Sequence, residues 1–348
     1  MQLVDLPVEL LALLPAFLHN IEDFINASSS CKTLRNACGL TSSKTILRLA
    51  AASSRVYFRP DPYFLIAATA RQVSDWALLN TENTETLRQA FRAGLDSLFE
   101  LCIAKGRLTM EDIRGLHASR FSTFNPIIDM IDKCAGEQWY STPNFWDGGV
   151  SDAETIGYDP PRSLFQIAIY GELFSTSMLA AISPSSALPR FDLQIRLEFI
   201  KYCIPDWMCH GAYQGFTVED IGPYAPGGHR EMDDNQLRLN HILHCRTWRE
   251  AWEKVRLQVG PDFEVEWKQQ IWESAVQLTG LKGLELLRPM RVEERKERLI
   301  GIYRSIERLE SKDQPGSHKY GVREHVAFDF PSMAHEVWVC CAGCWGPW

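Results

Sequence analysis

Apolar side chains recur at steps of three and four along most of the chain, which is the repeat of an α-helix with one buried face. In the first segment, Leu10, Leu11, Leu14, Phe17 and Leu18 follow this repeat. They come after Pro7, which suits a first helical position because no amide proton is needed there. A second segment begins near Asp23, a good N-terminal cap. The pattern predicts two or three short helices whose apolar faces exceed what so small a unit can bury.

The same repeat predicts helices through most of the remaining chain. An unbroken apolar stripe runs from Asn83 to Gly106 and predicts one helix there. Thr109 to Asp112 has the pattern of a capping box, which predicts the start of another helix. The further helices are expected at residues 63–80, 124–134, 163–182, 190–203, 231–258, 264–279 and 290–311.

Three stretches lack this repeat. Residues 136–162 and 211–229 combine Gly and Pro with large aromatic residues, which indicates long ordered loops. Residues 312–348 show no clear period. We therefore expect a mainly α protein in three parts: a small helical module at residues 1–50, a larger irregular α-helical domain at 51–311 and an irregular C-terminal tail.

The first module carries a recognisable motif. A Leu-Pro pair is followed by a Glu two residues later, a Leu-rich helix, an acidic turn and a closing Cys-Lys-x-x-Arg. These features lie at Leu6, Pro7, Glu9, Leu10, Leu14, Leu18, Asp23, Phe24, Cys31, Lys32, Leu34 and Arg35. The pattern resembles the F-box and is most similar to that of fungal F-box proteins. The sequence of residues 70–77 is also similar to one that follows the F-box in that group. It departs from the family at Pro15, inside the first helix, and in a slightly longer turn between the helices.

The resemblance implies docking on the Skp linker subunit of an SCF-type ubiquitin ligase, and through it on a cullin. The remaining helices would then present a protein substrate to be ubiquitinated, with no catalysis by this chain and no cofactor. In that family the module's apolar residues contact the linker or form its scaffold, while Glu9 and Arg35 cap or orient helices. The implied positions are Leu6, Pro7, Glu9, Leu10, Leu14, Phe17, Leu18, Phe24, Ile25, Cys31, Leu34 and Arg35.

Two other functions stay open beside the adaptor. One is an F-box interaction protein that acts outside a ubiquitin ligase, and the other is an enzyme whose site is assembled from distant residues. The two aromatic loops, at 136–162 and 211–229, are candidates for contact with a substrate, although their rings would equally fill gaps between helices.

Composition favours a folded protein of the cytoplasm or nucleus. Hydrophobic residues make up 45% of the 348 positions and charged residues 23%, which excludes a disordered chain. The net charge of -8 argues against nucleic acid as a partner. We expect no signal peptide and no membrane span, because acidic residues interrupt the apolar start and charges break the later apolar runs. The ten cysteines are mostly scattered singly, which indicates reduced thiols rather than disulfides.

Two groups of residues have the chemistry of metal ligands. One has Cys-x-x-Cys spacing near the end of the printed sequence, but a closed zinc site needs four ligands and no second pair follows. The other lies on one expected helix and lacks the Glu of a His-Glu-x-x-His site. We expect reduced cysteines and neutral histidines, with no bound metal. The groups are Cys340, Cys341 and Cys344 with His335, and His241, His244 and Cys245.

Overall fold

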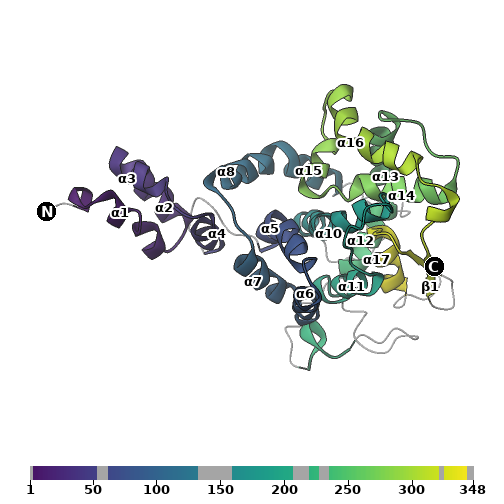
Figure 1. The fold of residues 1–348 in the computed structure, drawn as a ribbon, viewed down its shortest axis with the longest axis horizontal. Coiled ribbons are helices and arrows are strands. Elements are labelled where there is room, and N and C mark those ends of the chain that lie inside the picture. Colours follow the sequence, from purple (N-terminus) through teal and green to yellow (C-terminus); the bar gives the residue numbers. More distant parts are fainter. Residues whose placement is uncertain are drawn as a thin grey trace, which may run out of the picture.

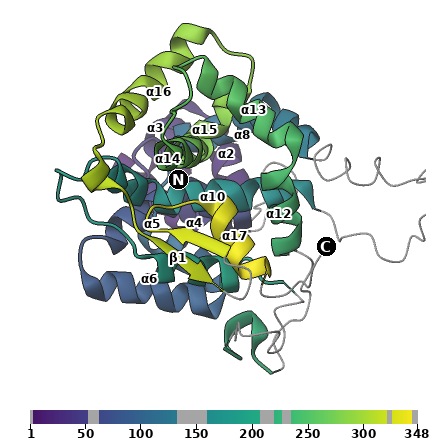
Figure 2. The same ribbon diagram turned by 90° about the vertical axis from the view of Figure 1, so that its right-hand side faces the viewer.

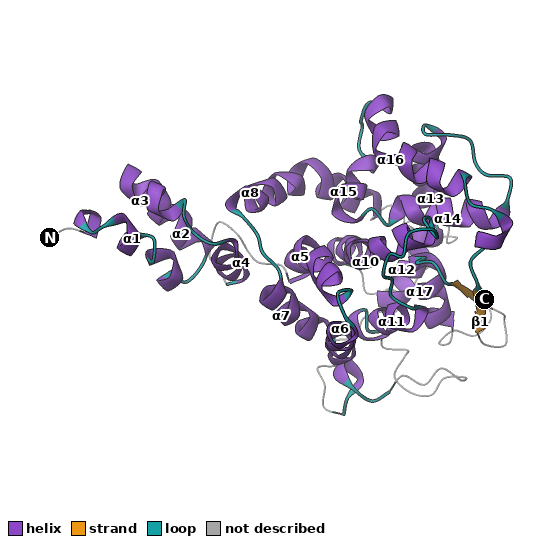
Figure 3. Ribbon diagram, in the orientation of Figure 1, coloured by secondary structure: helices purple, strands orange, loops and turns teal. Residues whose placement is uncertain are grey.

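The computed structural model describes residues 3–52, 62–131, 159–206, 219–226, 235–320 and 325–342. Helices make up most of this part of the chain, and the sheet found in it has two strands (Figure 3). The expectation of a mainly α fold is confirmed. Residues 3–52, here called the N-terminal module, project from a larger helical body (Figure 1).

Short helices build the N-terminal module. The cap of α2 is Asn20, whose side-chain oxygen accepts a hydrogen bond from the Asp23 amide at 2.9 Å. The expectation that Asp23 caps this helix is therefore wrong by three residues, since Asp23 lies in the first turn. The elements of the module are η1 (a 3-10 helix, Leu3–Asp5), α1 (Val8–Leu11), η2 (a 3-10 helix, Leu14–Phe17), α2 (Ile21–Ser30), α3 (Lys32–Cys38) and α4 (Ser43–Ala51).

Pro15 does not kink one long helix. Helix α1 ends at Leu11, and Pro15 lies in the first turn of η2, where an amide proton has no intrahelical partner. The Ala16 amide still donates to the Leu13 carbonyl at 3.0 Å, so the backbone keeps a helical path up to Phe17. The proline thus divides the expected first helix into two short ones.

Two buried helices, α5 and α10, form the centre of the body. Helix α10 packs against α5 and α15, and α5 packs also against α7. By length and composition α10 could span a membrane, but 78% of that apolar window is buried inside the fold. Residues 125–131 are also helical. The helices of the body are α5 (Pro62–Ala77), α6 (Thr81–Ala93), α7 (Leu95–Lys105), α8 (Met110–Ser119), the π-helix η3 (Arg120–Phe124), α10 (Pro160–Ala181), α11 (Leu193–Glu198), the π-helix η6 (Phe199–Cys203), the 3-10 helix η8 (Gly222–Tyr224), α12 (Asn235–His244), α13 (Arg246–Leu257), α14 (Glu266–Gln277), α15 (Gly280–Leu284), the 3-10 helix η9 (Glu285–Leu287), α16 (Val292–Glu307) and the 3-10 helix η10 (Ser311–Asp313).

The expectation of one helix from residue 83 to 106 is wrong. The chain breaks at Gly94, where φ is 99°, a left-handed conformation that glycine adopts without steric cost. A Cβ atom there would also lie 3.3 Å from Cδ of Pro223. The next expected feature is confirmed, because Thr109 and Asp112 form both hydrogen bonds of a capping box at the start of α8.

A second expected helix also divides. Residues 235–257 form α12 and α13, separated at Cys245. The Cys245 sulfur accepts a hydrogen bond from the Trp248 amide at 3.3 Å and so caps α13. The remaining expected helices of the body are confirmed within one to three residues at most of their ends, apart from the parts that lie outside the described residues.

The expectation of an irregular tail from residue 312 is wrong. Strands β1 (Ser317–Tyr320) and β2 (His325–Phe328) pair antiparallel, with Ser317 opposite Phe328, and α17 (Met333–Ala342) follows. Helix α17 packs against α12 and β2, and it lies with β1 on the side of the body away from the N-terminal module (Figures 1 and 2). Because α17 is apolar on nearly all sides, it shows no amphipathic repeat.

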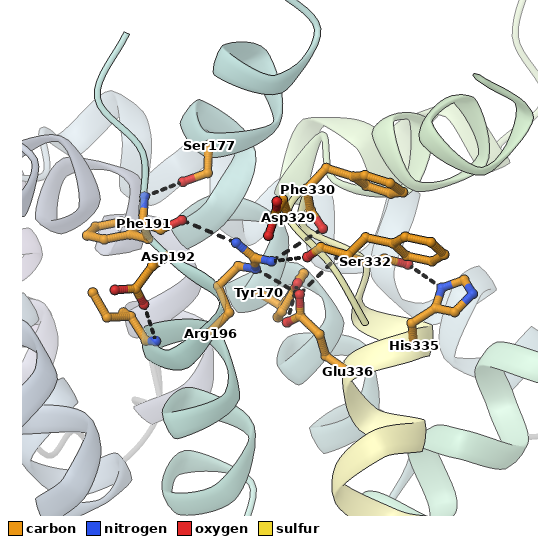
Figure 4. A network of polar contacts seen from close by, with 12 residues as sticks. Tyr170, Ser177, Phe191, Asp192, Arg196, Asp329, Phe330, Ser332, His335 and Glu336 are labelled. Atoms are coloured by element: carbon orange, nitrogen blue, oxygen red, sulfur yellow. Dashed lines mark hydrogen bonds and ion pairs between the residues drawn. The ribbon is translucent and has the colours of Figure 1, made fainter. Parts of the chain in front are cut away.

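One buried ion pair holds this C-terminal segment to the body. The guanidinium of Arg196, on α11, donates to the Glu336 carboxylate of α17 at 2.7 Å and to the Phe328 carbonyl at 2.7 Å. Tyr170 of α10 donates its hydroxyl to the same carboxylate, also at 2.7 Å (Figure 4). Both charged side chains are 0% exposed. Three segments far apart in the sequence therefore meet at one carboxylate.

Candidate docking face of the N-terminal module

The N-terminal module has a small apolar interior of its own. Leu11 of α1 is buried against Leu34 and Ala37 of α3, and Leu6 and Leu14 pack against this cluster. The other side of the module joins the large core of the body, through Ile21 and Phe24 of α2 together with buried residues of α4. Helix α4 contacts α7 and α8 of the body and α2 packs against α4, while α1 and α3 close around a separate cluster.

Helix α1, the turn after it and η2 expose large apolar side chains. The exposed fraction is 52% for Leu10, 56% for Leu13 and 76% for Phe17, and Val8 is exposed as well. Single exposed apolar residues are ordinary, but four within ten positions make this segment a candidate for a binding surface. We call Val8, Leu10, Leu13 and Phe17 the docking row. Leu3 and Leu40 are further exposed leucines of the module.

The residues expected at the linker contact fall into two sets. Phe24 and Leu34 are buried, and five others are half-buried against the module's cluster or the main core. The half-buried set is Leu6, Leu14, Leu18, Ile25 and Cys31. The exposed set is Pro7, Glu9, Leu10, Phe17 and Arg35. The exposed set offers most of its surface to a partner in the folded protein, the half-buried residues only a part, and Phe24 and Leu34 almost none.

The residues expected to contact the Skp linker did not include Val8 and Leu13. The helical repeat that begins at Leu10 continues through Leu14, and this phase leaves Leu13 out. Of the residues on the expected apolar face, the structure buries Leu11 but exposes Leu10 and Phe17, and the chain turns between the end of α1 at Leu11 and the start of η2. The exposure of Leu13 agrees with its place off the expected apolar face, whereas the turn itself was not contained in the periodicity.

A single arginine of α4 holds the end of η2 in place. One terminal nitrogen of Arg48 lies 3.2 Å from the carbonyl oxygens of Pro15 and Ala16 and 3.4 Å from that of Leu18. The last carbonyls of a helix have no intrahelical partners, and a positive charge there is favourable. Arg48 therefore fixes the backbone on both sides of Phe17, so that this exposed ring is presented from an ordered turn.

The two groups of possible metal ligands do not assemble within the described residues. No three His, Cys, Asp or Glu side chains are placed there to hold one ion. Cys340 is buried, and the side chains of Cys341 and Cys344 lie outside the described part. Cys245 caps α13, and Nδ1 of His244 lies 2.9 Å from the Asn240 carbonyl oxygen.

His335 has instead a structural environment on α17. Its Nδ1 lies 2.8 Å from the Ser332 hydroxyl, and burial lowers the pKa of His335 from 6.5 to about 4. The unfolded chain therefore takes up a proton at His335 before the folded chain does. As pH falls from 6.5 towards 4, this residue should lower the free energy of unfolding by about 1.4 kcal/mol per pH unit, an effect absent above pH 6.5.

Urea denaturation at several pH values between 7.5 and 4.5 measures this effect. The His335→Gln variant should lose that part of the pH dependence, so its stability relative to the unchanged chain should improve as pH falls. His19→Gln, at an exposed histidine of the N-terminal module, is the matched control. Parallel curves for the unchanged chain and His335→Gln would contradict the assignment.

The two aromatic loops expected to contact a substrate lie mostly outside the described residues. Residues 159–162, at the end of the first stretch, belong to the start of α10, which Asp159 caps by accepting from the Arg162 amide at 3.0 Å. In the second stretch Tyr224 is buried, and its hydroxyl donates to the Lys201 carbonyl at 2.8 Å. This ring fills the core and is not available to a partner.

Comparison with known proteins places the chain in no group. No family model matches it, no curated protein matches it significantly, and no solved structure matches it significantly.

Proposed function

We propose that this protein is a substrate adaptor of an SCF-type ubiquitin ligase. The docking row binds the Skp linker subunit, the linker connects the chain to a cullin, and the helical body presents a protein to be ubiquitinated. The chain itself does no chemistry in this role.

The observation that carries the proposal is the exposure of the docking row on a projecting module. A helical partner with an apolar groove can bury such a row, because a few large apolar anchors usually supply most of the binding energy. The motif that resembles an F-box runs from Leu6 to Arg35 and so spans the docking row, of which Leu10 is itself a motif position. Sequence resemblance and surface chemistry thus point to the same segment.

Co-purification with the linker tests the proposal. The full chain, expressed with a Skp linker and a cullin, should recover both, and the assembled complex should support ubiquitin transfer in the presence of the conjugating enzymes. Failure to recover the linker at all would overturn the adaptor assignment. Recovery of the linker without the cullin would instead favour an interaction protein that acts outside a ligase.

A further inference from the structure

A groove of about 900 Å³ crosses the helical body. Residues of α5 and α10 line one part of it, and residues of α8 and of the segment around α15 line another. These helices are labelled in Figure 1. The buried side chains of Leu108 and Met178 contribute to its apolar lining, together with the exposed Leu179. Its volume lies at the upper end of the range of about 300–1,000 Å³ that is typical of ligand sites.

The charged residues around the groove are mostly acidic. Five carboxylates and two cations line it, an excess of three negative charges. Arg71 is neutralised by Glu172, since their side chains lie 2.6 Å apart, and Glu285 is paired with Arg298 at 2.8 Å. The carboxylates are Asp75, Glu111, Asp112, Glu172 and Glu285, and the cations are Arg71 and Lys282.

Three of these carboxylates remain available to a partner. Asp75, Glu111 and Asp112 are exposed, and no ion pair engages them within the described residues, although Asp112 also completes the capping box of α8. The only lining cation left without an ion pair in the same part of the chain is Lys282. A groove with an apolar lining and such a rim is complementary to a segment that carries apolar side chains among Lys or Arg.

The wall of the groove is held in a fixed geometry. Besides its pair with Arg71, the Glu172 carboxylate accepts a hydrogen bond from the Leu281 amide at 2.7 Å. The close approach requires glycine at position 280, where φ is 66° and a Cβ atom would lie 2.1 Å from a Glu172 oxygen. Because α10 and α15 are locked together, this wall is formed before a ligand arrives, which lowers the cost of binding.

We infer that this groove is the substrate-recognition site and that it binds a protein segment with apolar side chains flanked by Lys or Arg. That the bound segment belongs to a ubiquitination substrate rests on the proposed adaptor function. Binding of a peptide to the groove can be measured without that function. The apolar lining supplies the buried contacts, and the acidic rim selects against acidic segments and accelerates encounter with basic ones.

One glycine offers a way to block the groove without disturbing its walls. Gly115 of α8 lines it, and a Cβ atom at this position would meet nothing within 4 Å. Gly115→Trp should therefore fold and place an indole in the groove. Gly301 of α16 also has open space at its Cβ position but does not line the groove. Gly301→Trp is thus the matched control.

Peptide binding to the purified full chain tests the site. The probes are fluorescein-labelled synthetic peptides with the same Leu and Phe positions, in which the intervening residues are Lys and Arg, Glu, or Ser. By fluorescence polarisation, the basic set should bind at least about tenfold more tightly than the acidic set, with a preference that shrinks as salt rises. Gly115→Trp should abolish binding, and Gly301→Trp should retain it.

The rim has its own test. Asp75→Asn combined with Glu111→Gln should weaken binding of the basic set by about tenfold or less, and neutralising two carboxylates elsewhere, Glu253→Gln with Glu297→Gln, should leave it unchanged. Both control residues are exposed and lie outside the groove.

Equal binding of the three peptide sets, or no effect of Gly115→Trp, would overturn the inference. A dimer of the free chain that dissociates in Gly115→Trp would overturn it too, because the groove would then be a contact between two copies. Binding of the Skp linker by Gly115→Trp is measured in parallel. Loss of peptide with retained linker supports the groove, whereas peptide binding by a chain that never binds the linker refutes only the adaptor role.

Discussion

Replacing Leu13 and Phe17 together with Ser should reduce binding of the Skp linker by about a hundredfold or more. Both side chains are mostly exposed in the free protein and would be buried by the partner. Central apolar anchors of an interface each contribute about 2 kcal/mol or more, and two of them account for that loss. Isothermal titration of the purified chain with the linker measures it.

The same double variant should fold normally. Exposed positions away from caps and ion pairs usually change the free energy of unfolding by less than about 0.5 kcal/mol. The matched control is Leu79→Ser with Leu257→Ser, two leucines of the body that are as exposed as the docking row. Full linker affinity in the Leu13 and Phe17 double variant would remove the docking row from the model. Equal loss in the control would show that binding is nonspecific.

The structure also explains why a substitution of Leu6 is a poorer test. Leu6 packs against the module's own cluster beside Leu11 and Leu34. Its truncation would loosen α1 and the docking row together, because core cavities cost stability beyond the lost contact. A loss of linker binding would then report on folding of the module rather than on direct contact.

Arg196→Met should lower the free energy of unfolding by about 3–5 kcal/mol. The substitution removes the cation from a fully buried pair and leaves the Glu336 carboxylate without its charge partner. A buried charge without a partner destabilises the fold by more than the intact ion pair stabilises it. Burial raises the pKa of Glu336, and Arg196 opposes that shift. Without the arginine, Glu336 should take up a proton at higher pH, so the loss of stability should be smaller in acid.

Urea denaturation at neutral pH measures the cost of Arg196→Met. The double variant Arg196→Met with Glu336→Leu should recover much of the lost stability, because no unpaired charge remains in the core. Arg249→Met, at an exposed arginine of α13, should change stability by less than about 0.5 kcal/mol. A cost below about 1 kcal/mol for Arg196→Met would show that water reaches this site.

Periodicity predicted the helical class and most helix positions, but not the breaks between helices. The stripe through Phe91, Leu95 and Leu98 continues across Gly94, so the turn there depends on one left-handed glycine. Helix α17 was not predicted, for another reason. Val337 and Val339 are both buried, and a helix enclosed on nearly all sides has no polar face to mark its period.

The sequence indicated the N-terminal module as a candidate docking segment, but it did not show which side chains of the module are exposed. A motif identifies the residues that belong to a module, but their burial depends on how α1 and α3 pack. Leu10 and Leu11 are neighbours in the sequence, yet only Leu11 is buried. The groove of the body was not predictable, because its lining comes from helices that lie as far apart in the sequence as Ala67 and Ile302.

The pair between Arg196 and Glu336 also bears on how the protein is made. The two residues are 140 positions apart. At ordinary synthesis rates of about 5–20 residues per second, a ribosome needs roughly 7–28 s to reach the second after the first. During that interval Arg196 has no carboxylate from α17, and the core that this helix covers stays open to solvent. The body therefore cannot complete its folding before α17 has left the ribosome.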